Sequence, residues 1–510
     1  MGDIVIGSGP AGVSAAKALL ARGRLVTMLD GGKVLEPQAG AKRDTFAALD
    51  PASWNETQRL AWMQPQYETP LGQVRRFGSD FAMEPANATI SDAPDWFALR
   101  ASYAVGGLSN LWGSAVLPYR DQDISDWPVS PDELAPHYRA VAEYLPIAGG
   151  SDDLDRVLPA YGLNGQDRIQ PSHQATELLA RLATKRDALA GIGIFSGGAR
   201  QAVSTSCHRC GMCLHGCPFG LIWSAQDTLK YLRAHPNFSY QPGAVVLRFA
   251  EDSKGVTLHL ADGSVLVGNR VFLGTGVLET ARILLSSAPE HRELMLKDSQ
   301  HAFLPMLQRW KNQSQPDQGA YHTLPQIFME MDVPTISPNL VHSQIYTWND
   351  YFARDLHASY GRKIPFAKPF LTALSRRLIV AQIFLHSDHS HKIGLSLSPD
   401  GRLASRLEEN NATQHTLKAA TKHMARAMRN VGLVALTFAS RPGSPGSSFH
   451  AGSTLPMSNR QEAGTSDVLG RPAGLERVHV IDASVFPSIP ATTITFSVMA
   501  NAHRIGALAP

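Results

Sequence analysis

The feature that most constrains the fold lies in the first 30 residues, a glycine-rich turn between an apolar strand and a helix. "DIVIGSGPAGVSAAKALLARG" places Gly7, Gly9 and Gly12 in the spacing G-x-G-x-x-G. Gly7 permits a tight turn, Gly9 lets a pyrophosphate approach the backbone, and Gly12 lets the helix pack on the strand. A second strand, "RLVTMLD", ends in Asp30, where a carboxylate would bind a ribose hydroxyl. The pattern predicts dinucleotide binding without separating FAD from NAD.

Length and composition indicate a large globular protein. A chain of 510 residues predicts two or three domains, or one large two-lobed enzyme. Apolar residues make up 44% of the chain and charged residues 18%, which is ordinary for a globular protein. The 47 basic and 44 acidic residues give a net charge of +3, without a dense run or stripe of lysine and arginine. The sequence therefore argues against a nucleic-acid partner.

The longest apolar stretches set an expectation for location. "LIVAQIFL" (378–385) and "VGLVALTFA" (431–439) are too short to span a bilayer, so we expect no transmembrane segment. The first strand begins by the third residue, so we also expect no signal peptide. The default location is cytoplasmic. A periplasmic location is the alternative if the protein is exported together with a partner that carries a signal.

Three further stretches extend the pattern along the chain. They are "VFLGTGVLETARILL" (271–285), "YAVGGLSNLWGSAVLPYRDQDISDWPVSPDELAPHYRAVAEYL" (103–145) and "VHVIDASVFPSIPATTITFSVMANAHRIG" (478–506). With the glycine-rich turn, they resemble the glucose–methanol–choline (GMC) flavoprotein oxidoreductases. The second stretch is similar to the "GGSSxxWGG" loop and the "WP-x5-L-x-P-x-Y" motif of the iron–sulfur-containing sugar and alcohol dehydrogenase branch. The resemblance covers most of 1–300 and 440–510.

The resemblance implies an α/β fold, with a Rossmann-like FAD-binding domain like that of p-hydroxybenzoate hydroxylase and a substrate-binding domain that contains a β-sheet. We expect 1–130, 195–300 and 440–510 to form the FAD-binding domain. We expect 131–194 and 301–439 to form the substrate-binding cap. Within the cap, the histidine-rich turn around His386, His389 and His391 is interpreted as a polar loop, with a metal site as the alternative.

The resemblance also implies where FAD would bind. The glycine-rich turn would bind the pyrophosphate, Asp30 the adenosine ribose, and the backbone of Val245 or Val246 the adenine. The loop "GLSNLWG" (107–113) lacks the histidine that links the flavin in some members, so we expect noncovalent FAD. For the glycines, ordinary tight turns are the alternative. The remaining contacts would come from Gly106, Gly107, Ser109 and Asn110 around the isoalloxazine, and from Asp482 and Ala483 at the ribityl–phosphate part.

Two residues are candidates for catalysis. "SSFHAGSTLPM" (447–457) is similar to the family motif "H-x-x-G-T-x-x-M" and departs from it at Ser453, which makes His450 the candidate base. Imidazole suits this role because its unperturbed pKa lies near neutrality. The family usually ends "VFP-x3-G-x-N-P". This chain has Thr493 at the Asn position, and a hydroxyl can donate and accept a hydrogen bond but cannot act as a base.

All four cysteines lie in "CHRCGMCLHGCP" (207–218), here called the cysteine segment: Cys207, Cys210, Cys213 and Cys217. Their spacing, C-x2-C-x2-C-x3-C-P, is that of a bacterial ferredoxin loop and predicts an iron–sulfur cluster, [3Fe-4S] or [4Fe-4S]. In two-cluster ferredoxins the fourth cysteine ligates the other cluster, so the role of Cys217 stays open. The alternatives are a structural zinc site, or disulfides and packing without metal.

We therefore predict an FAD-dependent dehydrogenase that oxidises a hydroxyl of a sugar, polyol or other alcohol. Electrons would pass through the cluster to an acceptor protein or quinone, with a small or cytochrome subunit as a candidate partner. One alternative is a tailoring enzyme that desaturates or reduces a lipid or natural product. A second alternative is an electron-transfer subunit that has a flavin and a cluster but no substrate of its own.

Overall fold

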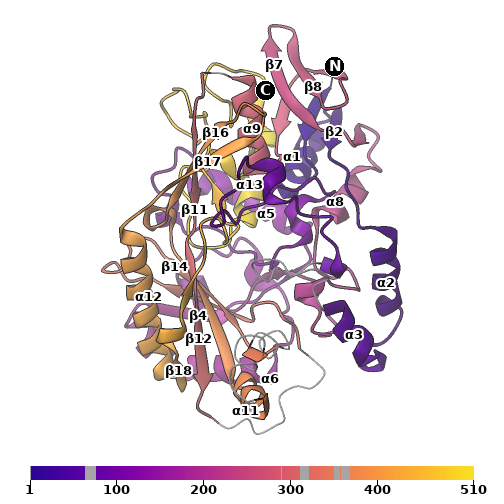
Figure 1. Cartoon of the computed structure of the whole chain (residues 1–510). Coiled ribbons are helices and arrows are strands. Elements are labelled where there is room, and N and C mark those ends of the chain that lie inside the picture. The colour runs from indigo at the N-terminus through magenta and orange to yellow at the C-terminus, as the bar shows by residue number, and fades with distance from the viewer. Residues whose placement is uncertain (1, 64–75, 289, 311–320, 350–355, 358–367) are drawn as a thin grey trace.

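The computed structural model describes residues 2–63, 76–288, 290–310, 321–349, 356–357 and 368–510. Figure 1 shows two lobes: the upper contains both termini, and the lower is built around a sheet that includes β12 (His301–Gln308) and β14 (Val341–Tyr346). The upper lobe contains a parallel sheet and the lower an antiparallel one. This arrangement confirms the predicted α/β fold with a Rossmann-like part and a second, β-sheet-containing part.

The parallel sheet has the strand order β21-β10-β1-β2-β6 within the described residues. Its strands pair in parallel with continuous register, for example Ile4 with Val271 and with Thr27. Crossover helices cover parallel sheets, so strands buried on both faces are nearly all apolar. The strand bounds are β1 (Asp3–Ile6), β2 (Val26–Asp30), β6 (Phe238–Pro242), β10 (Val271–Leu273) and β21 (Val478–Val480).

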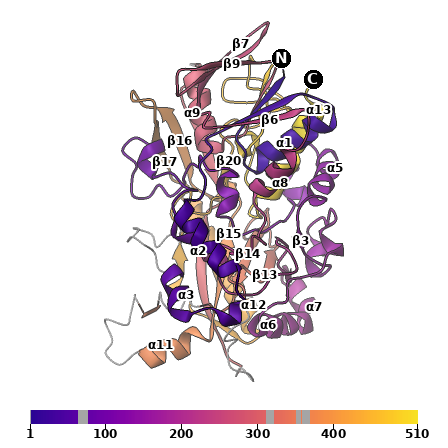
Figure 2. The ribbon, with the colours of Figure 1, turned by 90° about the vertical axis from the view of Figure 1, so that its right-hand side faces the viewer.

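Helix α1 (Pro10–Ala21) packs unusually closely on its neighbours. A Cβ atom on Gly12 would lie 1.8 Å from the carbonyl oxygen of Gly7, and one on Gly506 would lie 2.7 Å from that of Ala15. Glycine at both positions lets α1 pack against the turn and against α13 (Thr495–Leu508). Figure 2 shows α1, α13 and α5 (Pro131–Ala142) side by side in the upper lobe.

Further elements complete the upper lobe. A three-stranded antiparallel sheet, β7-β8-β9, contacts α9, and a four-stranded sheet has the order β17-β16-β11-β20 among the described residues. The bounds are β7 (Val246–Asp252), β8 (Gly255–Leu260), β9 (Val265–Gly268), α8 (Ala225–Leu232), α9 (Val277–Ser287), β11 (Leu294–Asp298), β16 (Lys392–Leu397), β17 (Leu403–Glu408) and β20 (Ala451–Gly452). Outside these sheets lie α2 (Pro37–Ala47), α3 (Glu56–Met63), α4 (Ala86–Thr89) and the two-stranded pair of β3 (Ile147–Ala148) and β5 (Gln201–Ala202).

The large antiparallel sheet of the lower lobe has the order β18-β12-β15-β14-β13-β4, with β19 beside β12, in the part of the chain that the structure describes. Side chains alternate between the faces of a strand. One face carries Ile379, Ala381 and Ile383 into a core shared with α6 and α12. The bounds are β4 (Ile194–Gly198), β12 (His301–Gln308), β13 (Ile327–Met331), β14 (Val341–Tyr346), β15 (Leu378–Phe384), β18 (Leu433–Ala435), β19 (Arg441–Pro442), α6 (His173–Thr184), α7 (Arg186–Ala190), α11 (Lys368–Ser375) and α12 (Ala412–Arg429).

The expected domain division, with 1–130, 195–300 and 440–510 against 131–194 and 301–439, stays a prediction. Contacts between elements cross its boundaries in several places, among them the pairing of β4 with β13 and of β19 with β12. Helix α5 packs on α13, and β16 pairs with β11 and with β17 rather than with the large sheet. Local signals do not decide these contacts, because an amphipathic element can cover any complementary apolar surface.

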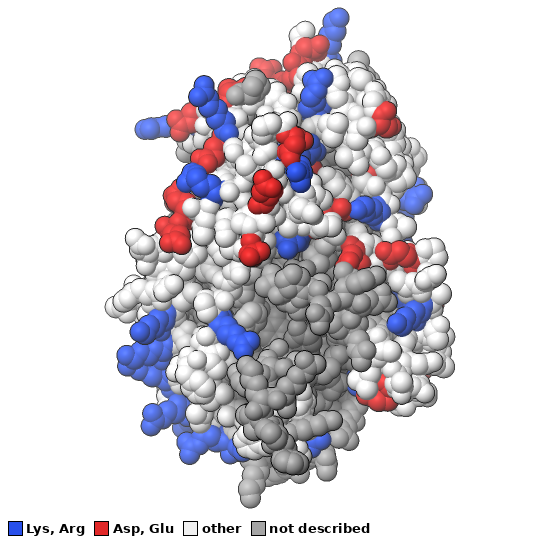
Figure 3. Space-filling model, viewed as in Figure 1, with Lys and Arg blue, Asp and Glu red and all other residues white. Residues whose placement is uncertain are grey.

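Lysine and arginine side chains gather over α12, at the lower left of Figure 3. The exposed residues are Lys418, Lys422, Arg426 and Arg429, and the helix contains no aspartate or glutamate. The sequence analysis missed this stripe because the cations are three or four residues apart. Separately, none of the described helices is long and apolar enough to cross a membrane.

We expect Gly12→Ala to destabilise the protein, because the added methyl group would overlap the Gly7 carbonyl oxygen. The loss in the free energy of unfolding should be about 3 kcal/mol or more, at the upper end of overpacking costs. Urea denaturation followed by tryptophan fluorescence measures it. Gly40→Ala is the matched control, because Gly40 lies in α2 with open space around its Cβ position. This substitution should raise the free energy of unfolding by about 1 kcal/mol. Equal stabilities for the two variants would contradict the close packing.

Candidate active site

A channel runs along the carboxyl ends of β1, β2 and β10, where a parallel sheet places ligand-binding loops. Eight of the residues predicted for the cofactor line it: Gly7, Gly9, Asp30, Gly107, Val245, Val246, Asp482 and Ala483. They come from five separate stretches of the chain, which the fold brings to one place. The roles assigned to them stay predictions.

Asp30 is held at the end of β2 by a buried hydrogen-bond network. Its Oδ2 accepts from the backbone N (2.9 Å) and the Oγ (2.7 Å) of Ser8, and its Oδ1 accepts from Gly32 N and Tyr240 OH. Burial raises the pKa of Asp30, and these hydrogen bonds oppose the rise. Ser8 Oγ also accepts from Gly106 N at 2.9 Å. Ser8, which the motif treats as a variable position, therefore links Asp30 to the loop of Gly106.

Asp482 ties the C-terminal stretch to the start of α9. Its Oδ2 accepts hydrogen bonds from Gly276 N (2.9 Å) and Thr280 Oγ1 (2.6 Å), and its Oδ1 accepts from Ser484 N. Burial raises the pKa of this carboxyl, and the hydrogen bonds counteract it. The carboxylate thus fixes the channel wall at Ala483.

The channel fits a dinucleotide. No protein atom lies within 4 Å of the position a Cβ would take on Gly9 or on Gly276, so these glycines leave room for something other than protein. The N-terminus of α1 begins there with no side-chain cap and no acidic residue in its first turn. Free N–H groups and the helix dipole favour a phosphate at such a place.

Four predicted cofactor residues do not line the channel. Gly12 is used for helix packing. Asn110 donates to the carbonyl oxygens of Val105 and Gly107, so its amide braces its own loop. Gly106 has a positive φ of 84° and its Cβ position is 2.9 Å from Gln226, which explains the glycine without a ligand. Ser109 lines the second cavity instead.

The second cavity, here called the substrate cavity, has a volume of about 410 Å³ and is lined by both catalytic candidates, His450 and Thr493. It shares wall residues with the channel: Pro10, Leu108, Phe449, Ile494 and Thr495. A ligand in the channel and a ligand in the substrate cavity would therefore meet across one wall.

The imidazole of His450 opens into the substrate cavity but is otherwise enclosed by protein. It stacks on Phe384 with ring centroids 4.9 Å apart, and its Nδ1 is buried without a hydrogen-bond partner among the described residues. Burial, with the nearby His342 and His301, lowers the pKa of His450 to about 3. The ring is therefore neutral at ordinary pH and can accept a proton.

Asp298, which no motif marked, holds the loop that precedes His450. Its Oδ2 accepts from Gly446 N (2.7 Å) and its Oδ1 from Ser448 Oγ (2.6 Å). Ser448 Oγ in turn accepts from His450 N at 3.0 Å. Burial raises the pKa of Asp298 to about 6. Asp298 ends β11, so only the fold brings it to a loop about 150 residues later.

Thr493 is buried at 3% exposure in the cavity wall. Its Oγ1 accepts a hydrogen bond from Leu117 N at 3.1 Å. An oxygen that already accepts can still donate its own proton, so Thr493 can present a hydroxyl donor to a ligand.

The cysteine segment does not form a metal site in this structure. The four thiols are free, and the described residues contain no group of three or more His, Cys, Asp or Glu side chains arranged to hold a metal ion. Cys207 and Cys213 pack in one apolar cluster and Cys210 in another. Burial raises the pKa of Cys207 to about 12 and raises those of Cys210 and Cys213. The structure and the comparisons thus give no support to the predicted cluster.

Arg76 lies beside the cysteine segment and is 5% exposed. Cys213 and Cys217 are its nearest anionic candidates, and burial lowers the pKa of the guanidinium to about 10, so it stays charged. Its hydrogen bonds go to the carbonyl oxygens of Leu111 and Trp112. Among the described residues, no carboxylate pairs with it.

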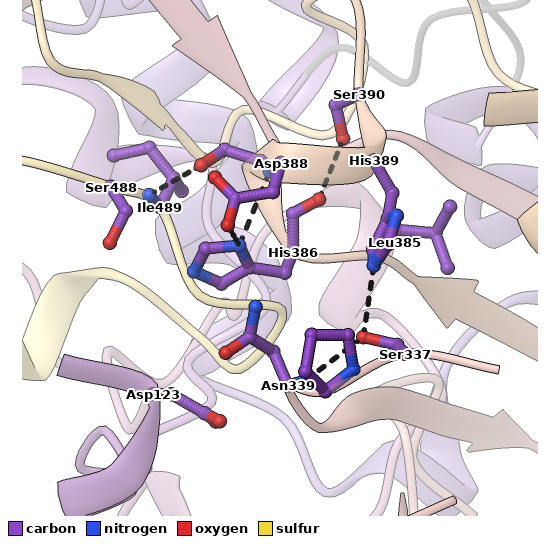
Figure 4. Close-up of polar contacts among 12 residues, drawn as sticks. Asp123, Ser337, Asn339, Leu385, His386, Asp388, His389, Ser390, Ser488 and Ile489 are labelled. Carbon is purple, nitrogen blue, oxygen red and sulfur yellow. Dashed lines mark hydrogen bonds and ion pairs between the residues drawn. The ribbon is translucent and has the colours of Figure 1, made fainter. Parts of the chain in front are cut away.

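The histidine-rich turn behaves as the polar loop that we expected. In Figure 4, His386 pairs through Nδ1 with Asp388 at 3.3 Å, while His389 points away toward Ser337, 3.1 Å from its Nε2. His391 Nδ1 accepts from Asn410 N at 3.0 Å. The three rings thus have separate partners, and they are not among any metal-holding group of the described residues.

A glycine-rich channel on a parallel sheet lies beside a cavity under an antiparallel sheet, in a two-lobed α/β fold. The crystal structure of pyridoxine 4-oxidase from Mesorbium loti is similar to this chain, with a TM-score of 0.58 at 14% identity, covering 99% of this chain and 98% of that one. At this identity the likeness establishes the fold alone.

Sequence comparisons agree with the fold. The C-terminal model of the GMC oxidoreductase family matches residues 397–502. Paromamine 6'-oxidase of Streptomyces fradiae is 26% identical over 265 residues, and 6'''-hydroxyparomomycin C oxidase of Streptomyces lividus is 25% identical over 267 residues. Each match covers 49% of this chain, and 41% and 42% of the respective relative. The C-terminal part of the chain, residues 397–502, is thus similar to the GMC oxidoreductase family.

The neutrality of His450 predicts how acid affects stability. Its folded pKa of about 3 lies below the unfolded value near 6.5, so below pH 6.5 the unfolded chain binds the extra proton and the folded state is penalised. Relative to His450→Gln, the wild type should lose stability between pH 6.5 and 4. The free energy of unfolding should change by less than about 1.4 kcal/mol per pH unit, because the ring is partly open to solvent.

Urea denaturation at several pH values measures this difference. His415→Gln, on the exposed face of α12, is the control and should show no pH-dependent difference from the wild type. A difference in the free energy of unfolding between the wild type and His450→Gln that stays constant with pH would contradict the lowered pKa of His450.

Proposed function

We propose that the protein oxidises a hydroxyl group of a small molecule, with FAD bound in the channel. The observation that carries the proposal is the position of His450: a neutral imidazole lines a cavity that shares a wall with the dinucleotide channel. The similar proteins are named as oxidases of paromamine, of 6'''-hydroxyparomomycin C and of pyridoxine, which supports a small-molecule donor.

FAD, when bound, supplies an acceptor for the hydride that leaves the carbinol carbon. The residues of the chain do the rest. His450 takes the hydroxyl proton, for which its enclosed ring is held neutral. Thr493 donates a hydrogen bond to the substrate oxygen and orients it, while Leu117 N fixes the position of the Thr493 hydroxyl. The substrate thus becomes a carbonyl compound, one proton going to His450 and one hydride to the flavin.

We expect His450→Ala to slow flavin reduction by a factor of about 10² to 10⁴, the usual worth of a general base. The rate is measured anaerobically by the loss of flavin absorbance, with paromamine, pyridoxine, sugars and polyols as donors. His415→Ala on α12 is the control and should keep the wild-type rate. Full turnover by His450→Ala would instead favour an electron-transfer subunit without its own substrate. If no donor in the panel reduces the flavin, the protein does not oxidise these alcohols, and the tailoring alternative is favoured.

An iron–sulfur relay to an external acceptor protein or quinone remains a separate hypothesis. The spacing of Cys207, Cys210, Cys213 and Cys217 supports it, and so does Arg76. A buried guanidinium is costly without an anion, and the groups that face Arg76 are Cys213 and Cys217. Thiolates bound to a metal would provide that anion. The thiols would have to move closer together than they lie here, since they do not form a metal site as they stand.

Metal analysis decides this hypothesis. The relay predicts stoichiometric iron and acid-labile sulfide in protein purified without oxygen, together with an electron paramagnetic resonance signal. Cys213→Ser should lose the iron, whereas Ser206→Ala, at an exposed position next to the segment, should keep it. Zinc in place of iron, or no metal in the wild type, would exclude the relay and make Arg76 a packing residue only.

A further inference from the structure

Side chains alternate between the two faces of the large sheet, and this alternation decides which of them face the substrate cavity. On β15, Ile379, Ala381 and Ile383 point into the core with α6 and α12, so Gln382 and Phe384 point the other way. On β14, Val341 and Ile345 point into the same core, which leaves Gln344 and Tyr346 on the cavity side. All four side chains line the substrate cavity, together with His450 and Thr493.

Gln344 and Gln382 form one polar unit with Tyr346. The two glutamines are cross-strand partners in the register of β14 and β15. The phenolic hydroxyl of Tyr346 lies 3.0 Å from Gln344 Oε1 and 3.5 Å from Gln382 Oε1, so it donates chiefly to Gln344. Among the described residues, no acceptor binds the Nε2 of either glutamine. Because Tyr346 holds the carbonyl oxygens, both amide nitrogens are free to donate to a ligand.

The described lining of the cavity carries no fixed charge. Its described lining residues include no aspartate, glutamate, lysine or arginine. The polar groups that line it are amides, serine and threonine hydroxyls, the phenol of Tyr346 and the neutral imidazole of His450. An ammonium or carboxylate group that entered would lose its hydration without gaining a counter-ion, which opposes its binding. A neutral hydroxyl group would exchange hydrogen bonds with water for hydrogen bonds with these amides and hydroxyls.

The remaining walls are apolar and aromatic, among them Trp112, Phe384 and Phe449. Phe449 adopts a left-handed backbone conformation with φ of 58°, which is uncommon for an aromatic residue. This conformation presents its ring at the wall that the cavity shares with the channel. Aromatic faces beside hydroxyl-binding amides suit a ring that has C–H groups on its faces and hydroxyl groups on its rim.

We propose that the substrate cavity selects an uncharged, polyhydroxylated ring over amino or carboxylate analogues, with Gln344 and Gln382 as specificity-determining residues that Tyr346 positions. The inference rests on the proposed function, because it names the substrate class of the same site. It also excludes a substrate that is recognised through its positive charge, since that recognition would need an acidic residue in the cavity wall.

The test compares matched probes that differ in charge: D-glucose and N-acetyl-D-glucosamine as neutral members, D-glucosamine as the cation and D-glucuronate as the anion, below the pH at which the amine loses its proton. Binding is measured by the change in flavin absorbance on titration under conditions of no turnover, and turnover by anaerobic flavin reduction. We expect at least one neutral probe to exceed both charged probes at least tenfold in kcat/KM and in affinity. A wild type that favours a charged probe, or that responds to no neutral probe in either assay, would overturn the proposal.

Variants test the two glutamines directly. Gln382→Glu should improve the affinity for D-glucosamine relative to its N-acetyl analogue at least tenfold, because it supplies the missing counter-charge. Gln414→Glu makes the same change on the exposed face of α12 and should leave the ranking as in the wild type. Tyr346→Phe removes the hydroxyl that orients the amides, so KM for neutral probes should rise several-fold with kcat nearly unchanged. An unchanged ranking in Gln382→Glu would contradict the assignment.

The two assays keep this proposal distinct from the proposed function. If neutral probes bind more tightly than charged ones but none reduces the flavin, then the oxidation proposal fails and the charge selectivity stands. If charged probes are both bound and oxidised in preference, the oxidation stands and the selectivity fails.

Discussion

The close approach of α1 to its surroundings is the constraint on which both cavities depend. Gly12 brings the helix so near the turn that a single methyl group would overlap the Gly7 carbonyl, and Gly506 does the same on the side of α13. Helix α13 follows directly after Thr493 and Ile494, so docking it on α1 carries the C-terminal stretch to the glycine-rich turn. Pro10, Ile494 and Thr495 then form part of the wall between the channel and the substrate cavity. One backbone contact thus joins the two ends of the chain.

Around the substrate cavity, the electrostatics depends on keeping the imidazole of His450 neutral. His301, Phe384 and His342 stand in register across three strands, and His450 stacks on the central ring. Crowding several imidazoles into a region of low dielectric lowers the pKa of His450, because each protonated neighbour would repel another. The uncharged surroundings keep His450 neutral, so that it can accept a proton. The same surroundings disfavour charged substrates, which is the basis of the proposed selectivity.

Arg76 and the cysteine segment present the opposite situation, a buried charge whose partner is not evident. Its guanidinium donates to the carbonyls of Leu111 and Trp112, both of which line the substrate cavity. An anion that paired with Arg76 would therefore act on the loop of Leu111 and Trp112 at the wall of the substrate cavity. Spacing alone predicted iron and sulfur here, whereas the packed thiols and the similar proteins do not support a cluster. Motif spacing fixes the order of ligands along the chain, but the tertiary environment decides their distances.

The sequence by itself determined what depends on a few neighbouring residues. The glycine-rich turn predicted β1, α1 and β2, and family motifs pointed to His450, Thr493 and the residues of the channel, because turns and helix starts impose local demands on residue type. Only the tertiary structure decided the rest. Asp298 supports the His450 loop from a distant strand, Asn110 turns out to brace its own loop, and Gln344 and Gln382 reach the cavity through strand register. No local pattern encodes these contacts, because register and packing arise when segments far apart in the chain meet, and one residue of slip would exchange Gln382 for its core neighbours.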